Sequence, residues 1–280
     1  MSLIGRPLSA RRAYLPWVAV AAVASASAGL LQLAGSTSDL ERYLGPLPPA
    51  ATMAAVGAAG LGALVLLERR GYWRRACESR TLRGLAVATA ATLPFAAAAI
   101  AVDMLVGFPE DTNVRWPAAW LFYPVIAVAA ETVFHLLPLA GLTWLSGIRL
   151  RGRGVDRRAA ALMVPTAAVE PAAQVLLGSA LPLFVLPHVF VFGLVQLILL
   201  RRYGYVPMLW FRVCYYLLWH VLWGGARLPL LFETPRVSRR RRSERCRRPP
   251  RCSAGARRPG CCGPWRRRSH RRVRSRRCGA

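Results

Sequence analysis

Seven apolar runs occupy most of the first 230 residues, and each is about as long as a helix that crosses a membrane. The runs are residues 14–34, 50–68, 83–107, 117–147, 159–178, 179–200 and 205–230. A hydrocarbon core takes roughly 20 residues of helix to cross, and a helix satisfies its own backbone hydrogen bonds in lipid. The sequence therefore predicts an all-α fold: a polytopic transmembrane bundle of about seven helices within residues 1–235.

Arginine is distributed unevenly between the loops. It precedes the first run and clusters in the second, fourth and sixth loops, whereas the other loops are poor in Arg and hold acidic residues such as Asp39 and Asp111. By the positive-inside rule, this alternation predicts a multi-pass protein of the plasma (inner) membrane with a cytoplasmic N-terminus. The first run also has features of a signal peptide, but its apolar stretch continues through Leu33 and favours a retained anchor.

Residues 236–280 have a different composition from the rest of the chain. They carry 19 of the 39 Lys and Arg residues, five of the seven Cys and a single acid, Glu244, without apolar periodicity. Such a segment cannot form a packed core, so we expect a disordered Arg/Cys-rich tail. Binding of nucleic acid or anionic lipid would suit its charge. We favour a third interpretation, an out-of-frame translation of a GC-rich gene, and expect no specific nucleic-acid partner.

Several ionisable residues lie inside the apolar runs, where a charge is costly and usually serves a function. They are Glu131, His135, Glu170, His188 and His220. Glu131 and His135 are four residues apart and share one face of a helix, and Glu170 and Gln174 repeat that spacing. His188 lies near a helix break that Pro182 and Pro187 predict. Residues from four runs could thus converge near the middle of the bilayer.

Each of these residues also has a structural interpretation. A transmembrane His is commonly an interhelical hydrogen-bonding group, and His220 lies between two Trp residues that suit a membrane interface. Glu170 precedes Pro171 and could be a buried protonated carboxyl at a kink. For His135, Glu170 and His188 the structural interpretation is the stronger one. For Glu131 the functional interpretation is the stronger one.

The order and context of these residues resemble the CPBP intramembrane proteases, relatives of the type II CAAX prenyl endopeptidase. That family carries Glu-Glu-x-x-Phe-Arg, then Phe-x-x-x-His, a helix with Gly, a Tyr/Gly turn, and His-x-x-x-Asn. The similar segments lie within residues 117–225 and are Ala130 to His135, Phe184 to His188, Phe192 to Leu194, Arg201 to Pro207, and His220 to Gly224. Glu170 to Gln174 has a spacing that also fits the second motif.

Three positions depart from the family pattern. The first Glu of the family falls on Ala130, the Arg falls on His135 and the final Asn falls on Gly224. In the family the first Glu and the His residues are thought to activate water, and the Asn helps to hold the oxyanion. The resemblance therefore implies either a divergent protease or a family member that has lost catalysis.

If the chain is active, the resemblance implies a metalloendopeptidase with Glu131, His188 and His220 as catalytic residues. Glu131 would accept a proton from a water held by His188 and His220, alone or through a divalent metal such as zinc, and that water would attack a peptide carbonyl. His135 or Gln174 would stabilise the oxyanion. The implied partners are membrane lipids and a membrane protein or peptide substrate.

A noncatalytic scaffold or a transporter is the alternative from another class. Buried Glu and His residues also form proton relays, and proline-interrupted helices line the substrate paths of carriers. A cluster of Glu131, His188 and His220 in one pocket would favour the hydrolase, whereas a file of polar groups across the membrane would favour transport.

Overall fold

The computed structural model describes residues 14–35, 38–73, 78–109, 112–114, 117–148, 150, 155–179 and 181–225. Helices account for most of these residues, and no strand occurs among them. The helices are α2 (Leu15–Leu33), α3 (Ser38–Leu44), α4 (Pro49–Arg70), α5 (Glu78–Leu105), α6 (Ala119–Ala130), η3 (Glu131–Leu136), α7 (Leu137–Leu145), α8 (Val155–Leu176), α9 (Pro182–Tyr203), α10 (Tyr205–Tyr216) and η4 (Leu217–Gly225). The prediction of an all-α helical bundle is confirmed.

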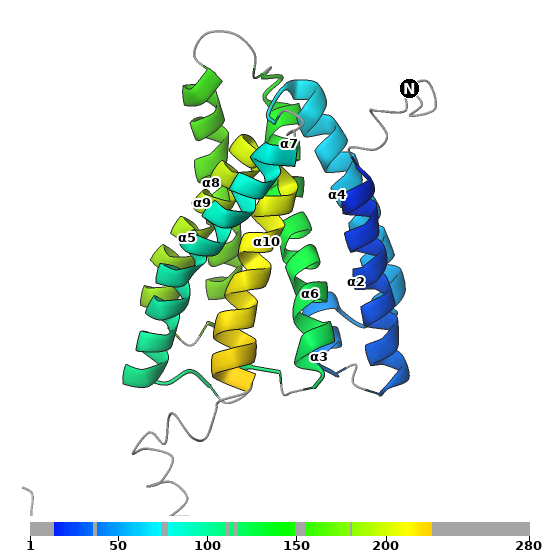
Figure 1. The fold of residues 1–280 in the computed structure, drawn as a ribbon, viewed down its shortest axis with the longest axis vertical. Helices are drawn as coiled ribbons and strands as arrows, with labels where there is room; N and C mark the ends of the chain where they lie inside the picture. Colours follow the sequence, from blue (N-terminus) through cyan, green and yellow to red (C-terminus); the bar gives the residue numbers. More distant parts are fainter. Residues whose placement is uncertain are drawn as a thin grey trace, which may run out of the picture. The chain divides into compact units, whose positions relative to one another are not determined.

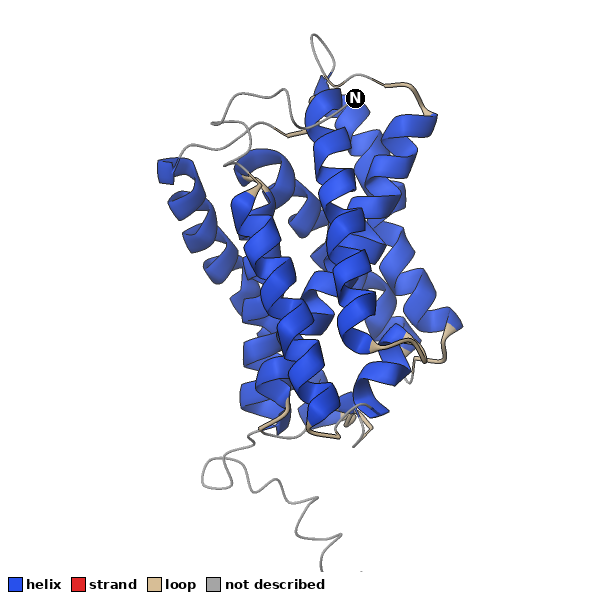
Figure 2. Ribbon diagram, turned by 90° about the vertical axis from the view of Figure 1, so that its right-hand side faces the viewer, coloured by secondary structure: helices blue, strands red, loops and turns tan. Residues whose placement is uncertain are grey.

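The long helices run up and down along one common direction (Figures 1 and 2). The most extensive contacts are those of α2 with α4, α8 with α9, and α5 with α10. Two segments, η3 and η4, are π-helical continuations of α6 and α10. π-Helical turns are rare and occur frequently at functional sites, and here they contain Glu131, His135 and His220.

Six helices of the described ranges are long and apolar enough to cross a membrane by length and composition. They correspond to the first six predicted runs. The span that matches the second run also includes α3 and covers Ser38–Arg70. The seventh predicted run forms the continuous helix α10–η4 but is not among the six. The break predicted around His188 is wrong in part, because α9 begins at Pro182 and continues through Pro187. Pro182 occupies the first turn, where a missing N–H costs little.

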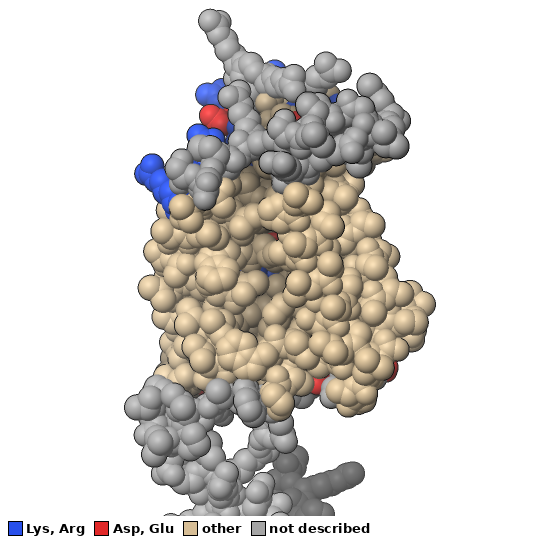
Figure 3. Space-filling model, turned by 45° about the vertical axis from the view of Figure 1, so that its right-hand side comes forward, with Lys and Arg blue, Asp and Glu red and all other residues tan. Residues whose placement is uncertain are grey.

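The outer surface of the bundle is apolar over most of its height. Figure 3 shows a broad belt in which charged side chains are visible only in one narrow hollow, with Lys and Arg gathered at one end and acidic residues at the other end and beside the Arg cluster. Large apolar side chains are exposed on this surface, among them Leu30, Leu93, Leu183 and Ile198. A soluble protein rarely exposes so much contiguous apolar surface, whereas a lipid-facing bundle does.

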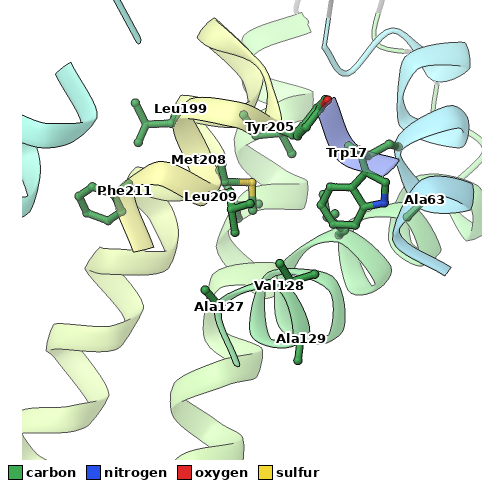
Figure 4. Close-up of a cluster of buried hydrophobic side chains, with 14 of the residues drawn as sticks. Trp17, Ala63, Ala127, Val128, Ala129, Leu199, Tyr205, Met208, Leu209 and Phe211 are labelled. Carbon is green, nitrogen blue, oxygen red and sulfur yellow. The ribbon is translucent and has the colours of Figure 1, made fainter. Parts of the chain in front are cut away.

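Small residues bring α4 close to α2, because the second apolar run is rich in Ala and Gly. A Cβ on Gly57 would lie 2.7 Å from the Cβ of Ala21, and one on Gly60 would lie 2.3 Å from Cζ2 of Trp17. The Trp17 indole N–H donates to the Gly57 carbonyl at 2.9 Å. Figure 4 shows Trp17 near Tyr205 in the buried core, with their ring centroids 5.8 Å apart. Glycine on one helix leaves room for the neighbouring helix and its side chains to approach this closely in a membrane.

The predicted tail, residues 236–280, lies outside the described residues, as do residues 226–235 at the end of the predicted membrane domain.

Candidate functional site

Arg212 lies at the centre of a buried polar cluster in the middle of the bundle. Its Nε donates to Oε1 of Glu131 at 2.5 Å. Its Nη1 donates to Oε1 of Glu170 at 2.8 Å, and its Nη2 donates to Oε2 of the same carboxylate at 2.5 Å. All three side chains are buried. A guanidinium at this depth is stable only when its charge is paired and its N–H groups are satisfied.

Every N–H group of Arg212 has an acceptor. Besides the three bonds to the carboxylates, Nη1 donates to the Tyr216 hydroxyl at 3.0 Å and Nη2 donates to Oε1 of Gln196 at 3.1 Å. The Gln196 amide in turn donates to Oε1 of Glu131. Five donors and five acceptors therefore form a closed network that ties η3, α8, α9 and α10 together.

His135 lies beside this network but does not form a hydrogen bond with it. Its Nδ1 is 3.5 Å from Oε2 of Glu131, and its Nε2 is 3.9 Å from Oε2 of Glu170. The imidazole is fully buried, and among the described residues both ring nitrogens and Oε2 of Glu131 have no hydrogen-bond partner. Unsatisfied polar atoms at this depth are costly, so three such atoms in one place mark the part of the cluster where a ligand or proton would be stabilised.

Two features of the local sequence position the side chains of the buried cluster: residue pairs four apart on one helix, and a glycine on α9. Glu131 and His135 share a face of η3, as their spacing predicts, and the Gln174 amide donates to Oε1 of Glu170 at 3.3 Å from the next turn of α8. On α9, Gly193 leaves the space that His135 occupies, because a Cβ there would lie 2.9 Å from Nε2 of the imidazole. A glycine at this position is required by the close approach of α9 to η3.

His188 lies in a separate aromatic group between α5, α9 and α10. Its Nε2 is 3.3 Å from the hydroxyl of Tyr215, and its ring lies 4.6 Å from that of Phe184 and 5.4 Å from that of Phe95. No hydrogen bond or ion pair joins it to Glu131 in the described part of the chain. Its surroundings are those of an interhelical hydrogen-bonding histidine.

His220 is held by Asn113, which precedes α6, and by Tyr123 of α6. Its Nδ1 lies 2.6 Å from Oδ1 of Asn113, and its ring stacks on Tyr123 at 4.8 Å. The space beside Gly224 is filled by the same Asn113, whose Nδ2 would lie 2.2 Å from a Cβ at residue 224. Tyr216 lies between His220 and the buried cluster. Its ring is 5.1 Å from the imidazole of His220, and its hydroxyl accepts a hydrogen bond from Arg212.

Of the predicted site residues, the structure brings together Glu131, His135, Glu170 and Gln174 and places His188 and His220 outside their hydrogen-bonded network. Sequence analysis missed Arg212, Gln196 and Tyr216. A signal for Arg212 was present, because an arginine in the middle of an apolar run meets the same criterion that selected Glu131.

The described residues contain no group of three or more His, Cys, Asp or Glu side chains that could hold a metal ion. In the buried cluster, Arg212 occupies the side of both carboxylates that a cation would approach, and its fixed positive charge opposes a divalent ion there. The donor set of the cluster thus does not fit a zinc site, which requires open ligands around one point.

The sequence matches no family model and no curated protein, and the fold matches no solved structure.

Proposed function

We propose that this chain is a noncatalytic integral membrane protein with the architecture of the CPBP proteases, in which an ion-paired network replaces the water-activating site. The observation that carries this proposal is that Arg212 binds the carboxylates of both Glu131 and Glu170. A general base must be free to accept a proton from water, and here Oε1 of Glu131 and both oxygens of Glu170 already accept hydrogen bonds from Arg212.

The positions of these residues support a relationship to the protease motifs. Glu131 belongs to the segment that resembles the first motif, and Glu170 begins the segment that also fits the second. On α10 the residues that face them are Arg212 and Tyr216, four apart, which is the spacing of His and Asn in the last motif of the family. In this alignment Gln174 stands in place of a His, and Arg212 and Tyr216 stand in place of His and Asn.

These replacements change the chemistry that the site can perform. A guanidinium only donates hydrogen bonds and does not lose its proton, so it can neither accept a proton from water nor bind a metal. The tyrosine hydroxyl is engaged by Arg212. The network instead stabilises one arrangement of four helical segments, which suits a scaffold that binds lipids or the membrane segments of another protein.

An intramembrane peptidase is the second candidate, and one observation favours it. Oε2 of Glu131 forms no hydrogen bond within the described part of the chain and lies 3.5 Å from Nδ1 of His135. A buried carboxylate beside an imidazole is a common arrangement for proton transfer. In this case Glu131 and His135 would move the proton of the attacking water, and neither His188 nor His220 would take part directly.

One experiment distinguishes the two candidates. Purified protein in proteoliposomes is incubated with a mixed library of transmembrane peptides, and cleavage is followed by mass spectrometry, with Glu131→Gln as the matched variant. If the protein is noncatalytic, the wild type and Glu131→Gln should show the same background level of peptide cleavage. Cleavage by the wild type that the variant lacks would overturn it and establish the peptidase, because Gln is nearly isosteric with Glu but cannot act as a base.

We propose the plasma (inner) membrane as the location, with the N-terminus in the cytoplasm. The support is the alternation of Arg-rich and Arg-poor connections together with the gathering of Lys and Arg at one end of the apolar belt (Figure 3). Clustered arginine is retained on the cytoplasmic side during insertion.

A further inference from the structure

We infer that the buried cluster binds one exchangeable proton, carried on Oε2 of Glu131 and donated in a hydrogen bond to Nδ1 of His135. This site goes beyond the proposed function and does not depend on it. It rests on the charge of the cluster, on its hydrogen bonds and on the space around His135.

The charge of the cluster requires a proton. Glu131 and Glu170 each carry a negative charge when ionised, and Arg212 supplies one positive charge, so the network would hold a net charge of −1 inside the bundle. An uncompensated buried charge is costly in a medium of low dielectric. One bound proton makes the cluster neutral. Asp103 is the other buried acid in the described part of the chain, and it accepts hydrogen bonds elsewhere, from Phe108 N–H and the Trp223 indole.

The hydrogen bonds identify which oxygen carries the proton. Both oxygens of Glu170 accept from Arg212, and Oε1 of Glu131 accepts from Arg212 and from Gln196. Oε2 of Glu131 is the one carboxylate oxygen of the cluster without a donor. A proton on this oxygen would point at Nδ1 of His135, 3.5 Å away. A small side-chain shift then satisfies two of the three unpaired atoms.

The same proton fixes the tautomer of the imidazole. When Nδ1 accepts from Glu131, the ring proton is on Nε2, which lies 3.9 Å from Oε2 of Glu170. A neutral His135 adds no second charge to the cluster. Among the described residues, Tyr216 and Tyr215 are the other titratable side chains near the network. The Tyr216 hydroxyl already accepts from Arg212, and the Tyr215 hydroxyl lies 3.3 Å from Nε2 of His188. Gln196, contributed by α9, is neutral.

A proton suits this site better than a larger ligand. Gly193 lies so close to Nε2 of His135 that a Cβ there would be 2.9 Å away, and Glu131 and His135 are almost fully buried. A proton requires no additional volume. Figure 3 shows a narrow hollow in the apolar belt with acidic and basic side chains at its floor, so charged groups within the bundle are not wholly sealed from the outside.

Infrared spectroscopy of the full-length protein in nanodiscs tests this inference. A protonated carboxyl group absorbs separately from a carboxylate, so the wild type at neutral pH should show one carboxyl band. Glu131→Gln should abolish the band, because it removes the carboxyl. Glu170→Gln should abolish it as well, because one carboxylate and Arg212 are neutral without a proton. Asp103→Asn is the matched control and should leave the band unchanged.

His135→Leu provides a second, independent readout. It leaves the charge balance unaltered, so the band should persist but shift to higher frequency, because the carboxyl group loses its hydrogen-bond acceptor. Folding of each variant is checked by size-exclusion chromatography, and the wild type and His135→Leu are sufficient if the Glu variants fail to fold. The inference is overturned if the wild type has no such band, if Glu131→Gln or Glu170→Gln retains it, or if His135→Leu leaves its frequency unchanged. None of these results bears on peptide cleavage.

Discussion

Arg212 and Glu170 form a two-pronged ion pair between α10 and α8, with N–O distances of 2.8 and 2.5 Å and both side chains buried. This geometry is the strongest that a guanidinium and a carboxylate can adopt, because two parallel charge-assisted hydrogen bonds form at once. The same guanidinium also binds Glu131 on η3. One side chain thereby links three helical segments that are distant in sequence.

Replacing Arg212 should therefore destabilise the bundle strongly. Arg212→Leu leaves two buried carboxyl groups without their donor, and loss of one partner of a buried ion pair costs about 3 to 5 kcal/mol. We expect a clear drop in the thermal unfolding midpoint of the protein in detergent, followed by tryptophan fluorescence. Arg212→Lys should recover only part of the loss, because an ammonium group cannot supply the five fixed donors of the guanidinium.

Arg202→Gln is the matched control for this prediction. Arg202 is exposed near the end of α9, so its replacement should leave the unfolding midpoint almost unchanged. Equal midpoints for Arg212→Leu and the wild type would show that the buried network does not stabilise the fold.

A methyl group on Gly193 should disturb His135 directly. In Gly193→Ala the new Cβ would lie 2.9 Å from Nε2 of the imidazole and 3.5 Å from Ala167. Overpacking a filled interior costs about 1 to 3 kcal/mol. Gly141→Ala is the control, because a Cβ at that helical position meets no atom within 4 Å. We expect a lower unfolding midpoint for the first variant only, and a drop of the same size in both would contradict the close contact.

Gly224 and Asn113 should be energetically coupled. A Cβ at residue 224 would lie 2.2 Å from Nδ2 of Asn113, so Gly224→Ala would displace the amide that holds His220. In an Asn113→Ala background the space is vacant and the same change should cost little. A double-mutant cycle of unfolding midpoints measures this coupling. Additive effects would mean that the two residues do not touch.

The orientation in the membrane can be measured with single cysteines. We place one at Ser38, on α3 near the Arg-poor end, and one at Ser146, beside the Arg-rich connection, in a background without native cysteines. Both positions are exposed. A membrane-impermeant thiol reagent should label Ser38→Cys in intact cells and Ser146→Cys only after permeabilisation. The opposite pattern would place the N-terminus outside.

The sequence by itself determined the helical class, the positions of the membrane-length helices and the side-chain pairs within one helix. Apolar length and backbone satisfaction in lipid leave few alternatives to a helical bundle. Glu131 with His135 and Glu170 with Gln174 were also predictable, because residues four apart share a helix face whatever the tertiary structure is. The π-helical turn at Glu131 did not separate that pair.

Only the tertiary structure decided which helices present their polar residues to each other. Arg212 is 81 residues from Glu131 and 42 from Glu170, and His220 is 107 residues from Asn113. Such contacts depend on the rotation of each helix about its axis, which small residues such as Gly193 and Gly57 set by allowing close approach. Because rotation is decided by packing with neighbouring helices rather than by local sequence, His188 and His220 could lie in apolar runs and still not join Glu131.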